Sequence, residues 1–517
     1  MGSISHILVV FCLTLLSSQG FLFLDDSCPY AKPCVCSLSS IYCQNQGLRQ
    51  VPQMIKPQIN SYYSMDVSQN LITSLPAAAF KNLTVGTLIV GPNPLTNIDD
   101  AAFVGLNVTW LILANVPGMT QIPASVSHLS TLKKLYVYRT NITGLDDSLM
   151  KGIGDTLEEL SISSTNITVW PTSMQYATKL RDLSAGGNTY NDIPDNAFQG
   201  FYHSLESVSL RKCGLNAVPR KALGRLIKLK TLDLSNNPFI LFPDDSFGPS
   251  LQNSLNTLYI SKTSVSDIPP AVRSLTFLST LGLCPNPVKT LNMMSFGGLS
   301  KSLERLYMAG CEMESIPPVM KTLTQLTLLD LTKSGLTTIR DDDFNGLSVL
   351  NELNLERNRF IKISDHAFRG LKYLHKLTLF QSNLTALPRA VNDLPFLKDL
   401  YAYENQITTI PDNSLVGARS LHHLVLDDNP ISQISDHAFD GASSLTLIMM
   451  TRGKMTTVPK ALTALDGFSR INLSDNPVQC TCDLKWILNY VNIEVGGDCY
   501  NMPLSVSKYI HTRLIHC

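Results

Sequence analysis

The sequence predicts an α/β solenoid with a parallel β-sheet on its concave face and disulfide-capped ends. One phrase, L-x-x-L-x-L-x-x-N-x-L, recurs between Tyr62 and Asn476 at intervals of 23 to 26 residues. Cysteines cluster in front of and behind these repeats. A single copy cannot bury its own leucines, so stacked copies must share one continuous core. Such a core grows in one dimension, which lets a chain of 517 residues form one array rather than several globular domains.

The repeats are expected over residues 62–478, in about 18 copies. The copies start at residues 62, 85, 108, 132, 157, 180, 205, 229, 255, 278, 303, 326, 350, 374, 397, 421, 445 and 468. The L-x-L stretch of each copy alternates inward and outward side chains, which predicts a short strand. The ninth position is Asn in nine of the eighteen copies, and its amide can satisfy backbone groups where the chain turns away from the strand. These residues are Asn70, Asn93, Asn188, Asn237, Asn286, Asn358, Asn405, Asn429 and Asn476.

The outer half of each repeat has two forms. One contains text such as "DHAFRGL" (Asp365 to Leu371), and the other contains a shorter turn such as "IPPAVRSL" (Ile268 to Leu275). We expect the phenylalanines of the first form to pack behind the sheet, and the prolines of the second to tighten its turns. The phenylalanines are Phe103, Phe198, Phe247, Phe296, Phe344, Phe368 and Phe439.

Residues 1–20 resemble a secretory signal peptide. An apolar run from His6 to Leu16 is followed by small residues at Ser18 and Gly20, where cleavage is expected. A membrane anchor is the alternative, but the run is short for a span of about 20 residues. No other segment approaches that length, so the sequence predicts a secreted, extracellular protein without a membrane span.

Composition and motifs exclude several functions. Lys plus Arg equals Asp plus Glu at 41 each, so nothing favours nucleic acid as a partner. The chain lacks G-x-S-x-G, H-E-x-x-H, P-loop and dinucleotide-binding fingerprints. We therefore expect no enzymatic activity, no cofactor and no metal site.

Two cysteine clusters lie where an open solenoid needs caps. The front cluster falls within residues 28–61 and the back cluster within residues 479–517, where "CTCDLKW" (Cys480 to Trp486) is distinctive. A secreted chain favours disulfides at such clusters over a four-thiolate zinc site. The spacing alone leaves three connectivities open for each cluster.

With these caps the chain resembles the extracellular leucine-rich-repeat proteins with Cys-rich flanking domains, such as Slit, chondroadherin and the insulin-like-growth-factor acid-labile subunit. The resemblance covers essentially the whole mature chain and implies a horseshoe-shaped repeat fold. It also implies the pairs Cys28–Cys36, Cys34–Cys43, Cys480–Cys499 and Cys482–Cys517.

Three further cysteines lie inside the repeats. Cys213 and Cys311 occupy the ninth position four repeats apart, about 19 Å at strand spacing, which is too far for a disulfide. Cys284 lies in the repeat before Cys311, two positions out of register on the open strand face, so we expect no bond between them. We expect Cys213 and Cys311 to be small buried hydrophobic residues. An intermolecular or reactive role for Cys284 is the alternative hypothesis.

Six N-x-S/T sequons predict a glycoprotein. They lie at Asn82, Asn107, Asn141, Asn166, Asn383 and Asn472, of which only Asn472 is expected on the concave face. If glycans cover surfaces that are not used, the concave face before the last repeat is free for a partner.

Aromatic and charged residues gather on the predicted concave face in two places. Tyr and Arg are favoured anchors of protein interfaces, so both places are candidate ligand-binding surfaces. The first holds Tyr136, Tyr138 and Arg139, and the second holds His375, Phe380, Tyr401, Tyr403, Glu404, His422, His423, Asp427 and Asp428. Ordinary solvated strand residues are the alternative interpretation of both.

Together these features predict a secreted, non-enzymatic recognition or scaffold protein. The resemblance implies an extracellular protein or matrix component as the ligand, bound on the concave face. Three alternatives stay open: an innate-immune pattern-recognition protein, a non-catalytic subunit of a secreted complex, and the ectodomain of a receptor. The sequence defines neither the oligomeric state nor the ligand.

Overall fold

The computed structural model describes residues 28–37, 39–58, 62–239, 242–465, 467, 469–490 and 492–517. The predicted signal peptide, residues 1–20, lies outside these residues. The chain divides into two compact units, Met1–Thr263 and Ser264–Cys517, which we describe one at a time.

The first unit contains a sheet in which β1 pairs with β2 antiparallel and every later pair is parallel. Its strands are β1 (Val35–Cys36), β2 (Ser40–Tyr42), β3 (Tyr62–Asp66), β5 (Thr84–Ile89), β7 (Asn107–Ile112), β8 (Lys134–Tyr136), β9 (Glu159–Ser161), β10 (Asp182–Ser184), β11 (Ser207–Ser209), β12 (Thr231–Asp233) and β13 (Thr257–Tyr259).

Over its described residues, the second unit contains ten strands of the large sheet, and consecutive strands of this set pair in parallel. They are β14 (Thr280–Gly282), β15 (Arg305–Tyr307), β16 (Leu328–Asp330), β18 (Glu352–Asn354), β20 (Lys376–Thr378), β21 (Asp399–Tyr401), β23 (His423–Val425), β25 (Leu447–Met449), β26 (Ser469–Asn472) and β27 (Ile493–Gly496).

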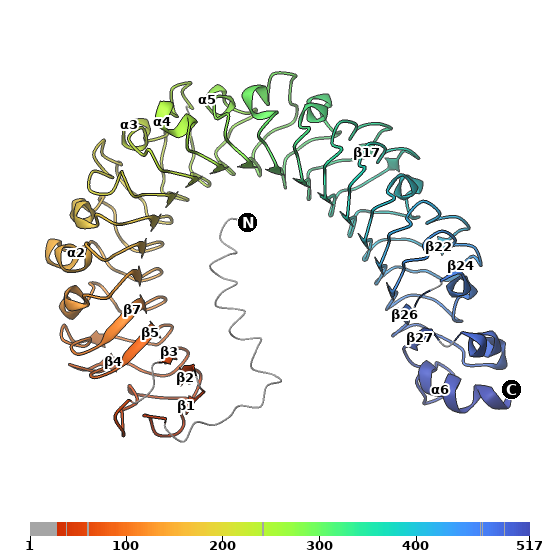
Figure 1. The fold of residues 1–517 in the computed structure, drawn as a ribbon, viewed down its shortest axis with the longest axis horizontal. Helices are drawn as coiled ribbons and strands as arrows, with labels where there is room; N and C mark the ends of the chain where they lie inside the picture. Colours follow the sequence, from red (N-terminus) through yellow and green to blue (C-terminus); the bar gives the residue numbers. More distant parts are fainter. Residues whose placement is uncertain are drawn as a thin grey trace. The chain divides into compact units, whose positions relative to one another are not determined.

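These parallel strands confirm the predicted α/β solenoid with its leucine-rich coils. In β12, Leu232 is fully buried while Thr231 and Asp233 on either side are half-buried. The register places Leu232 between Val208 and Leu258 of the adjoining coils, so the inward side chains form one continuous row. In each unit the strands line one side of the coils and the helices lie on the other (Figure 1).

The ninth-position asparagines join neighbouring coils. The amide of Asn237 donates to the carbonyl oxygens of Leu210 and Leu234, at 2.9 and 2.8 Å. Its oxygen accepts from the backbone N–H groups of Cys213 and Leu215, at 2.9 and 3.1 Å. One buried side chain thus satisfies four backbone groups that the turn would otherwise leave unpaired.

The outer half of the coils differs between the two sequence forms. Coils with the proline turn form one short helix directly after the proline, whose fixed φ suits a helix start. These helices are η1 (Ala124–His128), η2 (Thr172–Tyr176), α3 (Arg220–Leu223), α5 (Pro270–Arg273), η4 (Pro318–Thr322), η5 (Arg389–Asp393) and η6 (Lys460–Ala464). Further helices of the coils are α2 (Asp147–Ile153), α4 (Pro249–Gln252) and η3 (Gly297–Leu299).

Coils with the phenylalanine turn are mostly irregular on the outside, and some carry short paired strands. These pairs are β4 (Ser74–Leu75) with β6 (Asn97–Ile98), β17 (Thr338–Ile339) with β19 (Lys362–Ile363), and β22 (Thr409–Ile410) with β24 (Gln433–Ile434). The seven predicted phenylalanines are all buried, between 0 and 2% exposed. Phe344 and Phe368 of adjacent coils are in ring contact at 6.2 Å.

Both cysteine clusters form disulfides. The structure pairs Cys28 with Cys36, Cys34 with Cys43, Cys480 with Cys499 and Cys482 with Cys517, as the family resemblance implied. The front cluster adds β2 to the sheet beside β3, and the back cluster adds β27 beside β26. The back cluster also forms η7 (Cys482–Asn489), α6 (Val506–Thr512) and η8 (Leu514–His516).

The prediction that Cys284 and Cys311 do not bond is wrong. Their sulfur atoms are joined, with a Cα–Cα distance of 5.3 Å, and both residues are buried. The prediction assumed that Cys284 still followed strand alternation, but β14 ends at Gly282. Beyond the strand the chain turns, and the Cys284 side chain faces inward to meet Cys311 of the next coil. The alternative hypothesis, an intermolecular or reactive role for Cys284, is therefore wrong as well.

Cys213 is the free cysteine among the described residues, and it is fully buried as predicted. Its sulfur lies 3.6 Å from the carbonyl oxygen of Ala185, where an asparagine amide would donate in other coils. Burial raises the pKa of this thiol to about 12. The thiol is consequently protonated and unreactive at neutral pH.

Candidate functional site

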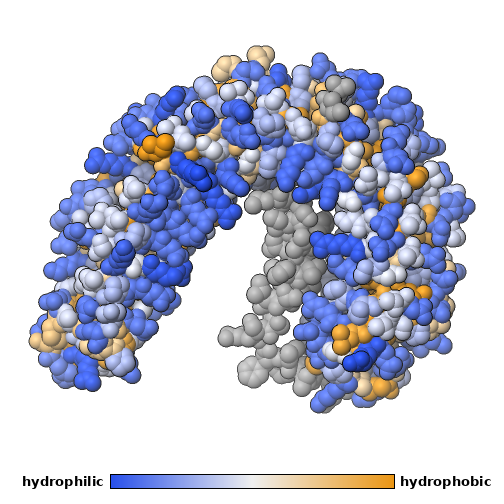
Figure 2. All heavy atoms as spheres, turned by 180° about the vertical axis from the view of Figure 1, so that it is seen from behind, coloured by the Kyte–Doolittle hydropathy of each residue, from blue (hydrophilic) through white to orange (hydrophobic). Residues whose placement is uncertain are grey.

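The open face of the strands is the surface that each unit offers to a large ligand. Here the residues that flank the buried leucines point away from the core, as the alternating burial of β8 and β21 illustrates. Figure 2 shows a mostly hydrophilic surface with scattered hydrophobic residues. An aromatic cluster on the open face of the strands is informative, because large exposed apolar patches are uncommon on soluble proteins.

One aromatic cluster of the first unit contains Trp110 on β7, Tyr136 on β8 and Tyr138 two residues after β8, all half-buried. The rings of Trp110 and Tyr136 meet edge to face at 5.2 Å, and Tyr138 lies 6.4 Å from Tyr136. The register pairs Trp110 with Lys134, whose amine lies 5.2 Å from the centre of the indole ring. We call these three rings and Lys134 the aromatic cluster.

Polar contacts hold the aromatic cluster in place. The Tyr136 hydroxyl donates to a carboxylate oxygen of Glu159 at 2.8 Å, and Lys134 forms an ion pair with the same carboxylate at 2.5 Å. Burial, followed by the contact with Glu159, raises the pKa of Tyr136 well above its ordinary range. Burial also raises the pKa of Tyr138, and the nearby Arg139 partly offsets this. Both phenols are neutral at physiological pH.

The structure brings Tyr136 and Tyr138 together as predicted, but it adds Trp110, which the sequence analysis missed. The indole N–H of Trp110 is buried and has no hydrogen-bond partner in the described part of the chain. A buried tryptophan N–H usually finds a partner. Trp110 could have been found from the repeat spacing, because it lies one coil before Lys134 in the same row.

The second predicted surface, in the second unit, centres on a pair of stacked rings. Phe380 and Tyr403 lie 4.4 Å apart with nearly parallel planes, and the guanidinium of Arg357 lies 5.5 Å from the Phe380 ring centre. Tyr401 is half-buried on the neighbouring strand row, in register with Thr378. Burial raises the pKa of Tyr403, so this phenol is neutral too.

The charged residues of this second surface already have partners within the protein. Asp427 accepts hydrogen bonds from the backbone N–H and the hydroxyl of Thr451, both at 2.7 Å. Glu404 accepts from Gln381, and Asp428 forms an ion pair with Arg452. These carboxylates stabilise contacts between coils, which leaves the aromatic rings as the part available to a ligand.

The three predicted histidines do not converge on one point. Nδ1 of His423 lies 2.6 Å from a carboxylate oxygen of Asp399, whereas Nδ1 of His375 lies 2.7 Å from the Asn351 amide. Nδ1 of His422 is occupied by the carbonyl oxygen of Ser420 at 2.6 Å. Across the described residues, no group of three or more His, Cys, Asp or Glu side chains is arranged to hold a metal ion.

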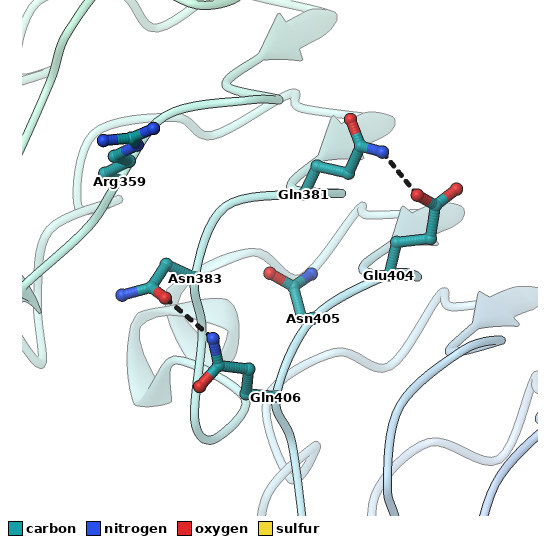
Figure 3. A pocket seen from close by; sticks show the side chains of 6 residues that line it. All are labelled: Arg359, Gln381, Asn383, Glu404, Asn405 and Gln406. Atoms are coloured by element: carbon teal, nitrogen blue, oxygen red, sulfur yellow. Dashed lines mark hydrogen bonds between the residues drawn. The ribbon is translucent and has the colours of Figure 1, made fainter.

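A polar hollow of about 620 Å³ lies beside the second surface (Figure 3). Its lining is Arg359, Gln381, Asn383, Glu404, Asn405 and Gln406. Small-molecule sites are mostly lined by apolar side chains, so this hollow is a poor candidate for one. It also contains the sequon residue Asn383, whose amide oxygen accepts a hydrogen bond from Gln406 at 3.0 Å.

The sequons differ in exposure. Asn82, Asn107, Asn141, Asn166 and Asn383 are exposed, whereas Asn472 on β26 is half-buried. The amide oxygen of Asn472 accepts from the backbone N–H and the hydroxyl of Ser474. Asn141 and Asn166 lie on adjacent coils with their side chains 3.3 Å apart.

The described residues include no helix that is long and apolar enough to cross a membrane. Aromatic rings on a strand face, with neutral phenols and paired charges around them, suit the binding of a macromolecular surface.

Family models match much of the chain. One described as "Leucine rich repeat" matches residues 324–384 and 419–478, and another with the same wording matches residues 228–250. A model described as "BspA type Leucine rich repeat region (6 copies)" matches residues 58–181.

Comparisons with known proteins and with solved structures agree with these leucine-rich-repeat family matches. Lumican from Coturnix japonica is 29% identical over 271 residues, which is 51% of this chain and 69% of lumican. The human "Leucine-rich repeats and immunoglobulin-like domains protein 1" is 26% identical over 235 residues, 45% of this chain but only 18% of that protein. The structure of a TLR13–ssRNA13 complex aligns with a TM-score of 0.64 at 21% identity, covering 88% of this chain and 72% of that one, which shows the shared fold. The chain is a leucine-rich-repeat protein with disulfides in both terminal clusters, homologous to lumican and related leucine-rich-repeat proteins.

Proposed function

We propose that the protein is a secreted, non-enzymatic recognition protein whose open strand face binds an extracellular protein or matrix component. The aromatic cluster of Trp110, Tyr136, Tyr138 and Lys134 is the observation that carries this proposal. Tryptophan and tyrosine dominate the binding energy of protein interfaces, and here they lie on a rigid sheet that needs little ordering upon binding.

The surroundings of the cluster support a protein ligand. The half-buried rings of Trp110 and Tyr136 lie beside the charged side chains of Lys134 and Glu159, so an apolar centre has a charged rim. This matches the apolar core and polar rim of protein interfaces.

Five disulfides support an extracellular location, because such bonds persist in oxidising compartments. Secretion and sequon glycosylation are part of the same proposal. The stacked Phe380–Tyr403 pair and Tyr401 would form a second contact area on the second unit.

The test places a photoreactive amino acid, p-benzoylphenylalanine, at Tyr138 and, as a control, at Tyr500, which is 73% exposed. Both proteins are crosslinked in native secretions, and the captured partners are identified by mass spectrometry. We expect one protein or matrix component to be captured through position 138 and not through position 500.

The affinity of that partner is then measured with Trp110→Ala, Tyr138→Ala and Tyr500→Ala. Loss of a central aromatic anchor should weaken binding by about tenfold or more, whereas Tyr500→Ala should have no effect. Unchanged affinity in both cluster variants would refute the cluster as the site. Tyr401→Ala and Tyr403→Ala test the second contact area in the same assay.

A further inference from the structure

A row of charged residues runs along the edge of the sheet, just before each strand. In the second unit, backbone hydrogen bonds between consecutive coils place Asn351, His375, Lys398 and His422 side by side in this row. We define the edge strip as residues 348–351, 372–375, 395–398 and 419–422. Two of its residues, His375 and His422, belong to the second predicted surface. Its other residues belong to neither predicted surface.

The first unit shows how this row is normally neutralised. Lys133, Glu158, Arg181, Glu206 and Lys230 occupy consecutive coils there, joined by the same backbone bonds. Their side chains pair across the coils, with distances of 3.0 Å for Lys133–Glu158, 3.8 Å for Arg181–Glu206 and 2.8 Å for Lys230–Glu206. Opposite charges alternate along this row, so each of the three cations has a carboxylate partner and the five residues together leave a net charge of only +1.

The edge strip breaks this pattern. It contains Lys372, Lys398 and Arg419, all exposed, and not one Asp or Glu. None of the ion pairs found over the described residues involves these three cations. Nearby carboxylates are already engaged, since Asp399 contacts His423 and Glu352 contacts Lys376. The strip therefore keeps a concentrated positive charge on a chain whose formal net charge is zero.

Exposed aromatic rings lie among these cations. Tyr373 and Phe396 are 54 and 48% exposed, and they stack on each other at 5.7 Å with an interplanar angle of 18°. The next coil has the small Ser420 in the equivalent position, which leaves the far face of Phe396 without a neighbouring ring. Exposed apolar rings beside unpaired cations form a surface for a ligand that carries both negative charge and flat apolar faces.

We propose that the edge strip binds a linear sulfated polysaccharide of the glycosaminoglycan type. Sulfate groups would accept hydrogen bonds from Lys372, Lys398 and Arg419, and the carbon faces of the sugar rings would pack on Phe396 and Tyr373. The cations recur from coil to coil, as the charges of a linear polyanion do. This choice of ligand rests on the extracellular location proposed above, which the five disulfides of the described residues support and where sulfated polysaccharides rather than nucleic acids are the abundant polyanions.

This inference can be tested separately from the proposed protein ligand, because Lys372, Phe396, Lys398 and Arg419 belong neither to the aromatic cluster nor to the second contact area. The probe is a size-defined heparin oligosaccharide, tested with the full-length protein at about 0.15 M salt, where distant charges are screened. The triple variant Lys372→Ala, Lys398→Ala, Arg419→Ala should weaken binding by about tenfold or more. The matched control is Lys289→Ala, Lys333→Ala, Lys454→Ala, which removes the same charge from exposed positions elsewhere in this unit.

Phe396→Ser tests the stacking contact without changing the charge. Phe396→Ser should weaken oligosaccharide binding by roughly threefold to tenfold. Phe396→Tyr keeps an aromatic ring at this position and should bind as well as the wild type. All substituted side chains are exposed, so the melting temperature should be unchanged and will show whether each variant is folded. Trp110→Ala should leave oligosaccharide binding intact, which separates this proposal from the proposed function.

Several results would overturn the proposal. One is absence of binding to the wild-type protein at this salt concentration, and another is an equal loss in the test and control triples. Undiminished binding of the fully desulfated oligosaccharide would remove the role of sulfate. Tighter binding of single-stranded oligouridylate or of a poly-glutamate peptide, lost in the same triple variant, would assign the strip to nucleic acid or to an acidic peptide instead.

Discussion

At the scale of single residues, the ninth position of each coil combines two requirements. Its side chain must satisfy backbone groups of two coils, as Asn237 does with four hydrogen bonds. In many coils the residue before it adopts a left-handed backbone, as Asn236 does with φ of 59°. Smaller substitutes keep part of the network: the Ser334 hydroxyl donates to the carbonyl oxygen of Met308 at 2.9 Å. Gly453 occupies the ninth position of its coil without a side chain for a steric reason, because a Cβ there would lie 2.6 Å from the amide oxygen of Asn476.

Asn237→Ala should lower the free energy of unfolding by about 2–4 kcal/mol, because buried backbone groups lose their partners. Asn237→Ser should cost less, since a hydroxyl can replace one donor. Chemical denaturation measures the stability, and hydrogen exchange should show lost protection at the amides of Cys213 and Leu215. The exposed Asn216→Ala is the control and should stay within about 0.5 kcal/mol of wild type. Equal stability of all three variants would contradict this role.

The residue scale also shows where sequence reasoning succeeded. The repeat phrase predicted the buried leucines, the asparagine ladder and the phenylalanines, because each depends on a periodicity that the sequence displays directly. It missed Trp110, because an aromatic cluster depends on which side chains of adjacent coils come into register. It missed the edge strip for a similar reason: unpaired charge becomes visible only when one row is compared across many coils.

At the scale of elements, the disulfide between Cys284 and Cys311 joins two consecutive coils inside the second unit. Cys311 occupies a ninth position, so this coil lacks the asparagine amide. The sequence could not reveal the bond, because strand alternation fails where β14 ends at Gly282 and the chain turns. The cap strands β2 and β27 were missed for a related reason, since neither segment carries the repeat phrase.

Replacing both Cys284 and Cys311 with Ala should lower the stability of the second unit by about 2–4 kcal/mol, because the loop between them regains its freedom in the unfolded chain. Peptide mapping without reduction should first show the two cysteines linked. Cys213→Ala serves as the control for losing a buried sulfur. Free thiols at positions 284 and 311 in the native protein would contradict the structure.

At the scale of the whole molecule, each coil contacts chiefly its neighbours, so stability is a sum of coil and interface contributions. A change in the packing of one coil therefore affects mainly the coils next to it. The terminal disulfides act on the coils beside them, and Cys482–Cys517 ties η7 to the last residues of the chain.

Replacing Cys482 and Cys517 with Ala should accelerate hydrogen exchange in β26 and β27, because the last coils then open more often. The strands near the middle of the second unit, such as β20, should keep their protection. Exchange followed by mass spectrometry resolves these segments. A uniform rise in exchange across the unit would contradict local coupling and indicate one cooperative block.

The internal disulfide also has a consequence for synthesis of the chain. Cys284 and Cys311 are 27 residues apart in sequence, so at about 5–20 residues per second they leave the ribosome within a few seconds of each other. If the chain is secreted, as proposed, the bond can close in an oxidising compartment while the coils after it are still being translated. Two adjacent coils are then locked before their successors exist, and they provide a finished edge on which each new coil can assemble.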